Sequence, residues 1–420
     1  MKFTVGRDAL GDAVAFVSRA LPSRPVVPLL SALLLEAAAD GLTLSCFDYE
    51  VSARVRVDAE VAEPGSALVP GKLLAEITRS LPARPAEFCR DADMMSLTCG
   101  RAEFGLVCLP AQDYPALPAS PEPAGAVDGG VLATAVAQVA AAASRDDTLP
   151  MLTAVCLDIS GDTMTLAATD RYRLAARDVT FAPAEPGLRM LALVPARFMV
   201  EAARTFVAGV PVTVAFGSDG DERGRAPHGG GDDQPRPAEG LVCFESGNRR
   251  LTGRLIAGEF IRYRSRFGAE FGCRAYLPAG PLIEAVRRAA LVAERAGPVR
   301  LTFRADQVVI EAHAEGRARA AETVGADFSG DQPVISFNPH YLLDGLTAAA
   351  AEATGETAGT DQPAAEADAD HGTGPGAGRI RLEFNSPAKP ALITWSQAEE
   401  GRDGPAFKYL LVPLRIPERT

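Results

Sequence analysis

Four positively charged residues of this sequence repeat at one spacing. Lys72 and Arg79 lie seven residues apart, and Arg197 and Arg204 occupy the same two places 125 residues later. Residues i and i+7 share one face of a helix, so each pair predicts a helix with a positive face and a shared negative counter-charge. The alternative is that these side chains only face water, as most Lys and Arg side chains do. Further candidates of the same kind are Arg24, Arg287, Arg288 and Arg295.

The sequence contains no set of residues that predicts catalysis. It has no G-x-x-x-x-G-K-[ST] phosphate loop and no G-x-S-x-G nucleophile motif. The four histidines are scattered without metal-ligand spacing, at positions 228, 313, 340 and 371. The seven cysteines form no C-x-x-C pair, which predicts small buried thiols in a reducing compartment. We therefore expect a non-catalytic protein with no metal and no cofactor.

The net charge of −12 comes mostly from two stretches of the chain. Residues 218–240 carry a net charge of −3 and residues 351–378 one of −6, which leaves −3 for the rest. Both stretches are rich in Gly, Pro, Ala and Asp, so they are predicted to be disordered acidic insertions. A nearly neutral body can still carry local basic faces and a nucleic-acid partner.

The elements that must position the repeated cations are themselves repeated. A segment from Pro28 to Asp48 recurs from Pro150 to Asp170, 122 residues later and with the same length. Val-Pro-Gly-Lys-Leu-Leu at 69–74 recurs as Val-Pro-Ala-Arg-Phe-Met at 194–199, with a fainter third copy around Pro339. A length of 420 residues accommodates three domains, so the repeat predicts one folding unit used three times.

Each unit is predicted to run helix, strands, helix, strands, from apolar residues at helical or alternating spacing. The predicted helices are 8–21, 71–80, 130–143, one from Pro195, 281–294 and one from Pro339. The predicted strands are 29–37, 42–46, 51–57, 87–90, 95–99, 103–109, 153–159, 163–168, 172–179, 299–303, 308–312 and 317–324. Pro-rich 115–123 and segment 259–272 predict the boundaries, giving domains 1–120, 126–258 and 268–420.

Five segments, in this order, resemble the bacterial DNA sliding clamp, the β subunit of the replicative DNA polymerase III. They are Met-Lys-Phe-Thr-Val at 1–5, Arg-Pro-Val-Val-Pro-Leu-Leu at 24–30, Leu-Pro-Ala-Gln-Asp-Tyr-Pro at 109–115, Ala-Thr-Asp-Arg-Tyr-Arg-Leu-Ala at 168–175 and Tyr-Leu-Leu-Val-Pro-Leu-Arg-Ile at 409–416. The resemblance covers the chain outside the two acidic insertions. Segment 145–153, Arg-Asp-Asp-Thr-Leu-Pro-Met-Leu-Thr, is similar to the actinobacterial type.

The resemblance implies an α+β fold of three clamp domains, each with two helices on antiparallel sheets, in a head-to-tail ring homodimer. Such a ring encircles duplex DNA without sequence preference and tethers the replicative polymerase, without catalysis, in the cytoplasm and away from membranes. It implies a DNA-binding role for Arg24, Lys72, Arg79, Arg197, Arg204 and Arg288. It implies a dimer interface at Phe104, Leu106, Leu291 and Val292, which are equally plausible as ordinary core residues.

The resemblance also implies a pocket between the second and third domains for short linear peptides of the polymerase, the clamp loader and repair proteins. Its residues would be Thr169, Arg171, Tyr172, Arg173, Leu174, Ile261, Arg266, Leu410, Leu411, Val412, Pro413, Leu414 and Arg415. An extended apolar peptide would suit exposed apolar side chains at this place. The alternative is that Leu411 and Leu414 fill the core of the last domain.

Two of these positions depart from the family pattern. Ile261 stands where the family has Pro, and Arg266 stands where it has Val or Leu. The loss of Pro loosens the backbone, and a cation in an apolar subsite costs desolvation unless it reaches water or an acid. The departures predict an altered affinity for partner peptides. They also raise an alternative: a divergent clamp-fold protein that sequesters a clamp-targeting inhibitor and confers resistance to it.

Overall fold

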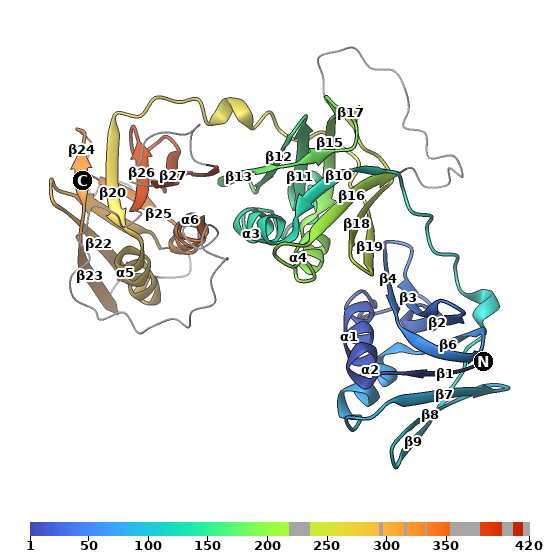
Figure 1. Cartoon of the computed structure of the whole chain (residues 1–420). Coiled ribbons are helices and arrows are strands. Elements are labelled where there is room, and N and C mark those ends of the chain that lie inside the picture. The colour runs from blue at the N-terminus through green and yellow to red at the C-terminus, as the bar shows by residue number, and fades with distance from the viewer. Residues whose placement is uncertain are drawn as a thin grey trace. The chain divides into compact units, whose positions relative to one another are not determined.

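The structure is a computed structural model that describes residues 1–217, 236–293, 297–314, 317–331, 334–352, 379–396 and 406–414 (Figure 1). Most of the two predicted acidic insertions lies outside these residues. The exceptions are 236–240, which include the short strand β17 (Arg236–Pro237), and 351–352 at the end of a helix. Within the described residues, no helix is long and apolar enough to cross a membrane.

The described chain divides into two compact units. Unit 1 comprises residues 1–129, 182–188 and 201–255, and unit 2 comprises residues 130–181, 189–200 and 256–420. The second predicted domain therefore contributes strands to both units. Each unit has its own buried apolar core, with side chains such as Phe88 in unit 1 and Phe384 in unit 2 fully buried.

All six predicted helices are confirmed, with ends shifted by at most three residues. They are α1 (Arg7–Ser18), α2 (Gly71–Ser80), α3 (Gly129–Ala140), α4 (Ala196–Ala203), α5 (Ala279–Val292) and α6 (Pro339–Ala350). The N-cap of α1 is Gly6, and Asp8 lies in the first turn, where a carboxylate favours the positive end of the helix. Asn338 caps α6, because its side chain accepts hydrogen bonds from the backbone N–H groups of His340 and Tyr341.

Unit 1 contains two antiparallel sheets, with strand orders β5-β1-β7-β8-β9 and β14-β10-β16-β18-β19-β4-β3-β2-β6 (Figure 1). The strands are β1 (Lys2–Val5), β2 (Ala32–Ala38), β3 (Gly41–Phe47), β4 (Val51–Val57), β5 (Ala59–Glu63), β6 (Gly65–Pro70), β7 (Ala86–Asp91), β8 (Met94–Cys99), β9 (Ala102–Val107), β10 (Pro123–Asp128), β14 (Ala182–Pro183), β16 (Pro211–Gly217), β18 (Leu241–Ser246) and β19 (Arg249–Arg254). Helices α1 and α2 pack against each other, and α1 also covers β3 and β4.

Unit 2 contains the strand orders β15-β11-β12-β13-β28-β27-β26-β20-β24 and β23-β22-β21-β25. The strands are β11 (Ala154–Ser160), β12 (Thr163–Thr169), β13 (Arg173–Thr180), β15 (Arg189–Pro195), β20 (Cys273–Pro278), β21 (Val299–Phe303), β22 (Gln307–Ala314), β23 (Ala318–Gly325), β24 (Asp327–Ser329), β25 (Val334–Phe337), β26 (Arg379–Phe384), β27 (Ala391–Ser396) and β28 (Phe407–Leu411). Helix α5 packs on β22, β23 and α6.

The strand orders repeat one pattern three times. A group of five strands recurs as β5-β1-β7-β8-β9, β14-β10-β16-β18-β19 and β24-β20-β26-β27-β28. A group of four recurs as β4-β3-β2-β6, β13-β12-β11-β15 and β23-β22-β21-β25. The last strand of a five-strand group pairs with the first strand of a four-strand group twice: β19 with β4 in unit 1, and β28 with β13 in unit 2. The threefold repeat predicted from the sequence is confirmed.

The sequence placed the starts of two strands too early. The predicted strand 29–37 begins only at Ala32, because a 3-10 helix occupies Pro28–Ser31, and the predicted strand 153–159 follows a second 3-10 helix at Pro150–Thr153. Proline has a fixed φ and no N–H, so each segment starts as a helical turn before pairing begins. Strands β2 and β3 pair as a hairpin, with Ala38 opposite Gly41.

Candidate functional site

The turn between β12 and β13 is built around one carboxylate. Asp170 Oδ1 accepts hydrogen bonds from the backbone N–H groups of Tyr172 and Arg173, both at 3.0 Å. The hydroxyl of Thr169 donates to the carbonyl of Arg173 at 2.6 Å and accepts from the N–H of Arg171 at 3.2 Å. These bonds hold Arg171 at a φ of 80°, a conformation that non-glycine residues rarely adopt. The turn is therefore fixed by its own side chains.

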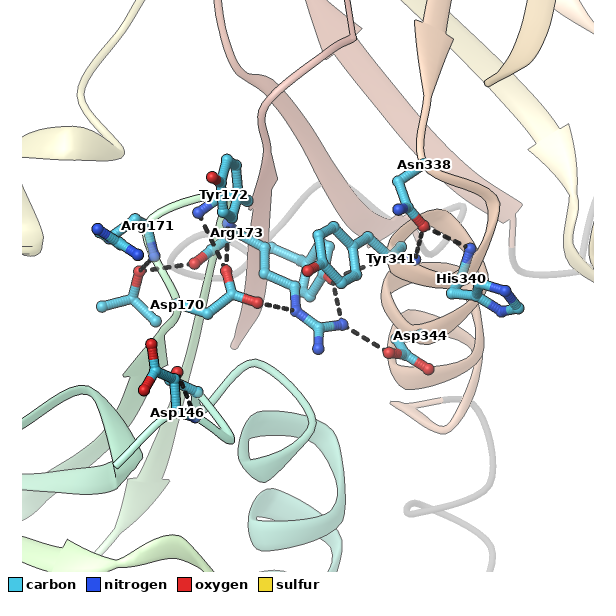
Figure 2. A network of polar contacts seen from close by, with 12 residues as sticks. Asp146, Asp170, Arg171, Tyr172, Arg173, Asn338, His340, Tyr341 and Asp344 are labelled. Atoms are coloured by element: carbon cyan, nitrogen blue, oxygen red, sulfur yellow. Dashed lines mark hydrogen bonds and ion pairs between the residues drawn. The ribbon is translucent and has the colours of Figure 1, made fainter. Parts of the chain in front are cut away.

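Arg173 connects this turn to helix α6 within unit 2 (Figure 2). Its Nε lies 2.9 Å from Asp170 Oδ2, and one terminal nitrogen lies 2.5 Å from Asp344 Oδ2 and 3.4 Å from the hydroxyl of Tyr409. The guanidinium also lies over the ring of Tyr341, 4.2 Å from its centroid. Burial raises the pKa of the Tyr409 phenol, which keeps that hydroxyl protonated.

A second ion pair joins the same strand and the same helix. Arg177 on β13 lies 2.9 Å from Glu352, which follows α6 by two residues. Arg173 and Arg177 point to one face of β13 and are about 13 Å apart along a strand. Asp344 lies within α6 and Glu352 just beyond its end, so the two ion pairs hold β13 to this helix at two points.

The opposite face of the same sheet carries an apolar row. Leu174 on β13 lies opposite Leu410 on β28, and Leu410 lies opposite Leu392 on β27. These side chains belong to a buried group that we call the junction cluster. Its members are Ala154, Cys156, Ala167, Leu174, Ala176, Leu193, Tyr263, Leu392 and Leu410, with Met151, Leu191, Ile256, Phe260, Phe267 and Phe271 packed against it.

The segment between the second and third predicted domains crosses this face. The hydroxyl of Tyr263 donates to Asp158 Oδ2 at 2.7 Å, and the Nε and a terminal nitrogen of Arg264 lie 3.1 and 3.0 Å from the same oxygen. Burial raises the pKa of the Tyr263 phenol, and the hydrogen bond to Asp158 raises it further. The segment is thus bound to the sheet at its centre, and Phe260 and Phe267 pack on the junction cluster on either side of Tyr263.

The structure shows how Ile261 and Arg266 are accommodated. Ile261 is 41% exposed, and Arg266 is exposed and has no acidic partner within the described part of the chain. Arg266 is the last residue of a short 3-10 helix, Arg264–Arg266, and its side chain is exposed to water. The desolvation cost anticipated for a cation at this position is avoided because the side chain does not enter the apolar group.

The C-terminal residues predicted for the peptide site divide between core and surface. Leu410 and Leu411 are buried, and full burial of Leu411 agrees with the alternative that it fills the core. Val412 is partly exposed, and its N–H donates to the carbonyl of Tyr172 at 2.9 Å, which brings it beside the Asp170 turn.

Of the three following residues, two are described. Pro413 is buried, and Leu414 is half-buried with its N–H on the carbonyl of Ser336 at 2.8 Å. Arg415 lies outside the described residues. Residues 410–414 thus lie beside β13 and the turn before it, and Val412 and Tyr172 are the exposed side chains there.

The first pair of repeated cations lies on one helix face as predicted. Lys72 and Arg79 are both exposed on α2. Glu76 is exposed between them, four residues after Lys72, which reduces the positive potential of this face. Arg24, in the loop before Pro28, is exposed as well.

The prediction that Arg197 and Arg204 share a helix is wrong. Arg197 is exposed on α4, but this helix ends at Ala203 and Arg204 follows it, 3.0 Å from Glu201. The helix ends in a tight turn, in which the backbone N–H and the hydroxyl of Thr205 both donate to the carbonyl of Ala202, at 2.9 and 2.7 Å.

Arg288 is the predicted DNA-binding residue with the strongest internal partner. Two of its nitrogens contact the two carboxylate oxygens of Glu322 on β23 at 2.8 Å each, and Glu284 lies 3.7 Å away. Arg287 forms an ion pair with Glu284. Because a bidentate carboxylate neutralises the guanidinium, Arg288 is less suited to phosphate binding than Lys72. Arg295 lies outside the described residues.

The four predicted dimer residues occupy an edge strand and a helix. Phe104 is half-buried and Leu106 is fully buried on β9, so only the backbone of Leu106 is available to another molecule. Leu291 on α5 is 83% exposed, and its neighbour Val292 is half-buried. A single exposed leucine is common on protein surfaces, so its exposure alone does not identify an interface.

The sequence offered little signal for several residues of this region. The acids that bind Arg173 and Arg177, which are Asp344 on α6 and Glu352 just after it, were not predicted. Asp158, Tyr263 and Lys408 were also not predicted. Within the described residues, no group of three or more His, Cys, Asp or Glu side chains could hold a metal ion.

Known solved structures share this fold. The chain superposes on the DNA polymerase sliding clamp of Bacillus subtilis with a TM-score of 0.81 at 23% identity, covering 99% of each chain. It superposes on a sliding clamp from Pseudomonas aeruginosa bound to griselimycin with a TM-score of 0.79 at 24% identity, covering 99% of this chain and 100% of that one.

Related sequences point to the same family as these structures. The chain is 42% identical to the beta sliding clamp of Streptomyces coelicolor, over 99% of this chain and 100% of that protein. It is 43% identical to the beta sliding clamp of Micrococcus luteus, over 77% and 98%, and 38% identical to the beta sliding clamp homolog GriR of Streptomyces muensis, over 83% and 88%.

The family match covers three successive segments. Residues 1–118 match the N-terminal domain, 126–261 the central domain and 267–354 the C-terminal domain of the DNA polymerase III beta subunit. The chain therefore belongs to the bacterial β sliding clamp family, the beta subunits of DNA polymerase III, and is of the actinobacterial type.

Proposed function

We propose that this clamp acts as a non-catalytic processivity factor in the cytoplasm. Two copies close head to tail around duplex DNA, and the ring holds the replicative polymerase, the clamp loader and repair proteins by short peptides. No step of this function requires a nucleophile, a metal or a cofactor. Persistence on DNA comes from encirclement, so the individual contacts with phosphates can be weak.

The observation that carries this proposal is the repeated strand joint. Within the chain, β19 pairs with β4 and β28 pairs with β13, each time a last strand of a five-strand group with a first strand of a four-strand group. Among the described strands, β9 is the remaining last strand of a five-strand group, and β23 is the remaining first strand of a four-strand group. Each of them pairs with a neighbour on one side only. A β9 edge of one copy and a β23 edge of another can therefore form the same joint.

Such a joint uses two different surfaces, so it links copies head to tail and produces a closed ring when the rotation permits. Helix α5 packs on β23 and presents Leu291 to solvent, which supplies an apolar contact beside the new joint. Burying that leucine contributes about 1.5–3 kcal/mol per interface. The interface thus combines backbone pairing with apolar burial.

For DNA, the proposal relies on Lys72, Arg79 and Arg197, with Arg24 and Arg204 as further contacts. Exposed cations that bind phosphates attract any duplex and read no bases, which permits sliding. Arg288 contributes less in this proposal, because Glu322 already neutralises it.

For peptides, the proposal relies on a contrast between the two joints. The turns beside them are alike: Asp48 accepts from the N–H groups of Glu50 and Val51, as Asp170 does from its own turn. Four residues later, however, the first joint pairs Ser52 with Thr252, where the second pairs Leu174 with Leu410. Only the second joint has an apolar row on this face, and the exposed Val412 and Tyr172 beside it suit the aliphatic side chains of an extended peptide.

The test is to load the purified protein on a closed circular DNA with a clamp loader and then linearise the circle. A topologically bound ring stays on the circle in high salt and leaves once the DNA has ends. Leu291→Glu should weaken the dimer and the retention together, whereas Val207→Glu, which changes an exposed aliphatic residue that belongs to none of β9, β23 and α5, should change neither.

Two results would overturn the proposal. One is release that does not depend on cutting the circle, and the other is a 44.0-kDa monomer at every concentration in gel filtration. A monomer that still binds clamp-binding peptides would favour the sequence-based alternative of a sequestering protein.

A further inference from the structure

Rows of paired residues cross each four-strand group. Each row starts at a carbonyl that accepts a hydrogen bond from a residue shortly after the five-strand group. These bonds run from the N–H groups of Leu109, Ile256 and Leu414 to the carbonyls of Leu68, Leu193 and Ser336. The strand partners that follow are Leu34, Ser45 and Arg54 in the first row, Cys156, Ala167 and Ala176 in the second, and Arg300, Glu311 and Ala321 in the third. The rows thus identify equivalent residues on β4, β13 and β23.

The first two rows continue across a joint, whereas the third ends at the open edge of β23. Arg54 on β4 pairs with Arg250 on β19, and Ala176 on β13 pairs with Lys408 on β28. The third row ends at Ala321, which has no further strand partner among the described residues. A β9 strand from another copy would bring the next residue of this row opposite Ala321.

The hairpin that precedes β9 identifies that residue. Hairpins β8–β9 and β18–β19 both close over two residues, and each turn starts with a glycine at positive φ. Ala102 on β9 therefore corresponds to Arg249 on β19, and Glu103 corresponds to Arg250. By this count, Glu103 of one copy lies opposite Ala321 of the next.

The sizes of the side chains fit this register. At three successive positions a large side chain of one strand meets a small residue of the other: Phe104 opposite Ala320, Gly105 opposite Arg319, and Leu106 opposite Ala318. A slip of one residue would exchange the two faces of the strand. A slip of two residues would place Phe104 opposite Glu322, whose carboxylate Arg288 already binds. Neither alternative keeps this fit.

The charges of the two edge strands are also complementary. Strand β9 contains one charged residue, Glu103, which is exposed and has no ionic partner within the described part of the chain. On β23, Arg319 is exposed and lies 3.3 Å from Glu311. Glu322 faces the other side of that strand, where Arg288 binds it. In this register Arg319 is a diagonal neighbour of Glu103 at about 7–8 Å, which a long side chain can span.

We infer that Glu103 and Arg319 form an ion pair across the ring joint, and that this pair fixes the register and selects the partner. The joint accepts a second copy of this chain and disfavours a clamp chain in which either charge is reversed. The inference rests on the proposed ring and adds which chains can share one. Arg319 then lies between two carboxylates, Glu311 of its own sheet and Glu103 of the neighbouring copy.

The expected size of the effect follows from the number of joints. A cross-strand ion pair changes affinity roughly 1.4- to 5-fold, and a ring of two copies has two joints, so loss of both pairs weakens the dimer roughly 2- to 30-fold. Reversing one of the charges exceeds this range, because repulsion replaces attraction at both joints. Most of the change should be in the dissociation rate.

The experiment uses two single variants, Glu103→Arg and Arg319→Glu. Each should form a weaker homodimer than the wild type, because both of its joints carry like charges. A mixed ring with one copy of each has opposite charges at both joints. When the two variants are labelled with a donor and an acceptor dye and mixed, energy transfer should therefore show more mixed dimers than random exchange gives. Labelled wild-type pools define random exchange, and Glu36→Arg, which reverses an exposed acid on β2, should behave like the wild type.

Cross-linking tests the register separately. With a short thiol reagent, Glu103→Cys combined with Ala321→Cys should give covalent dimers faster than Glu103→Cys combined with Thr323→Cys, which lies two residues away on the same face. The wild type, with its exposed Cys89, sets the background. Faster cross-linking of the second pair, or random mixing of the two charge variants, would overturn the inference while wild-type retention on circular DNA keeps the ring. A wild type that never dimerises would overturn both.

Discussion

Replacing Arg173 with methionine should lower the free energy of unfolding of unit 2 by more than the exposure of its partner Asp344 suggests. The side chains of Arg173 and Asp170 are 9% and 10% exposed, whereas that of Asp344 is 43% exposed. Methionine keeps a similar apolar stem but leaves the Asp170 carboxylate without its cation in a buried position. Removing one partner of a buried ion pair costs about 3–5 kcal/mol, so we expect a loss in that range.

The same geometry predicts a different result for the outer partner. Asp344→Asn removes a half-exposed charge, and exposed pairs contribute about 0–1 kcal/mol, so this variant should be nearly neutral. Asp170→Asn keeps an oxygen for the two backbone N–H groups of the turn while removing the charge. Combined with Arg173→Met it should recover part of the loss, because neighbouring residues couple by about 0.5–3 kcal/mol.

Urea unfolding followed by tryptophan fluorescence measures these differences. The one tryptophan of the chain, Trp395, lies on β27 in the same sheet as β13, so its signal reports on this unit. Arg204→Met, which removes an exposed ion pair, is the matched control and should stay near wild type. The reasoning is refuted if Arg173→Met loses less than about 1 kcal/mol, or if Asp344→Asn loses as much as Arg173→Met.

Two further changes test packing and charge elsewhere in unit 2. Gly345→Ala places a methyl group 2.5 Å from ring carbons of Tyr409, so it should lower the free energy of unfolding in urea by about 1–3 kcal/mol. The control Gly280→Ala, whose methyl group meets no atom within 4 Å, should be neutral or stabilise by about 0.4–1 kcal/mol. Equal effects of the two substitutions would contradict this expectation. The hydrogen bond from Arg288 lowers the pKa of Glu322, so this carboxylate stabilises the fold above its unfolded pKa of about 4.3 and loses that effect as pH falls through the folded pKa. The difference in Tm between wild type and Glu322→Gln should therefore shrink as pH falls below about 4.3, and a constant difference would contradict the assignment.

Helices and domain repeats could be predicted here because their signals are local. The six helices show apolar spacing within each segment, and the copies at Pro28 and Pro150 have equal lengths. The end of α4 was not predicted, because its residues continue the helical pattern into the turn at Thr205 that ends the helix. Likewise, alternation in a strand does not show that Leu106 faces the core.

The contacts of the candidate site could not be predicted for a different reason. Arg173 and Asp344 are 171 residues apart, and nothing near either residue indicates the other. Tyr263 and Asp158 are 105 residues apart and form their bond only because the crossing segment returns over β11. The departures at Ile261 and Arg266 were visible in the sequence, but their exposure depended on the course of that segment.

The pairing of β13 with β28 has a consequence for the synthesis of the protein. Strand β13 ends at Thr180 and its neighbour β28 starts at Phe407, so the free edge of β13 must wait for about 230 further residues. At translation rates of roughly 5–20 residues per second, this wait lasts about 10–50 s. An uncovered strand edge is a template for association with other nascent chains. The charges of Arg173 and Arg177 would disfavour such contacts during that interval, since a wrong neighbour provides no matching acids.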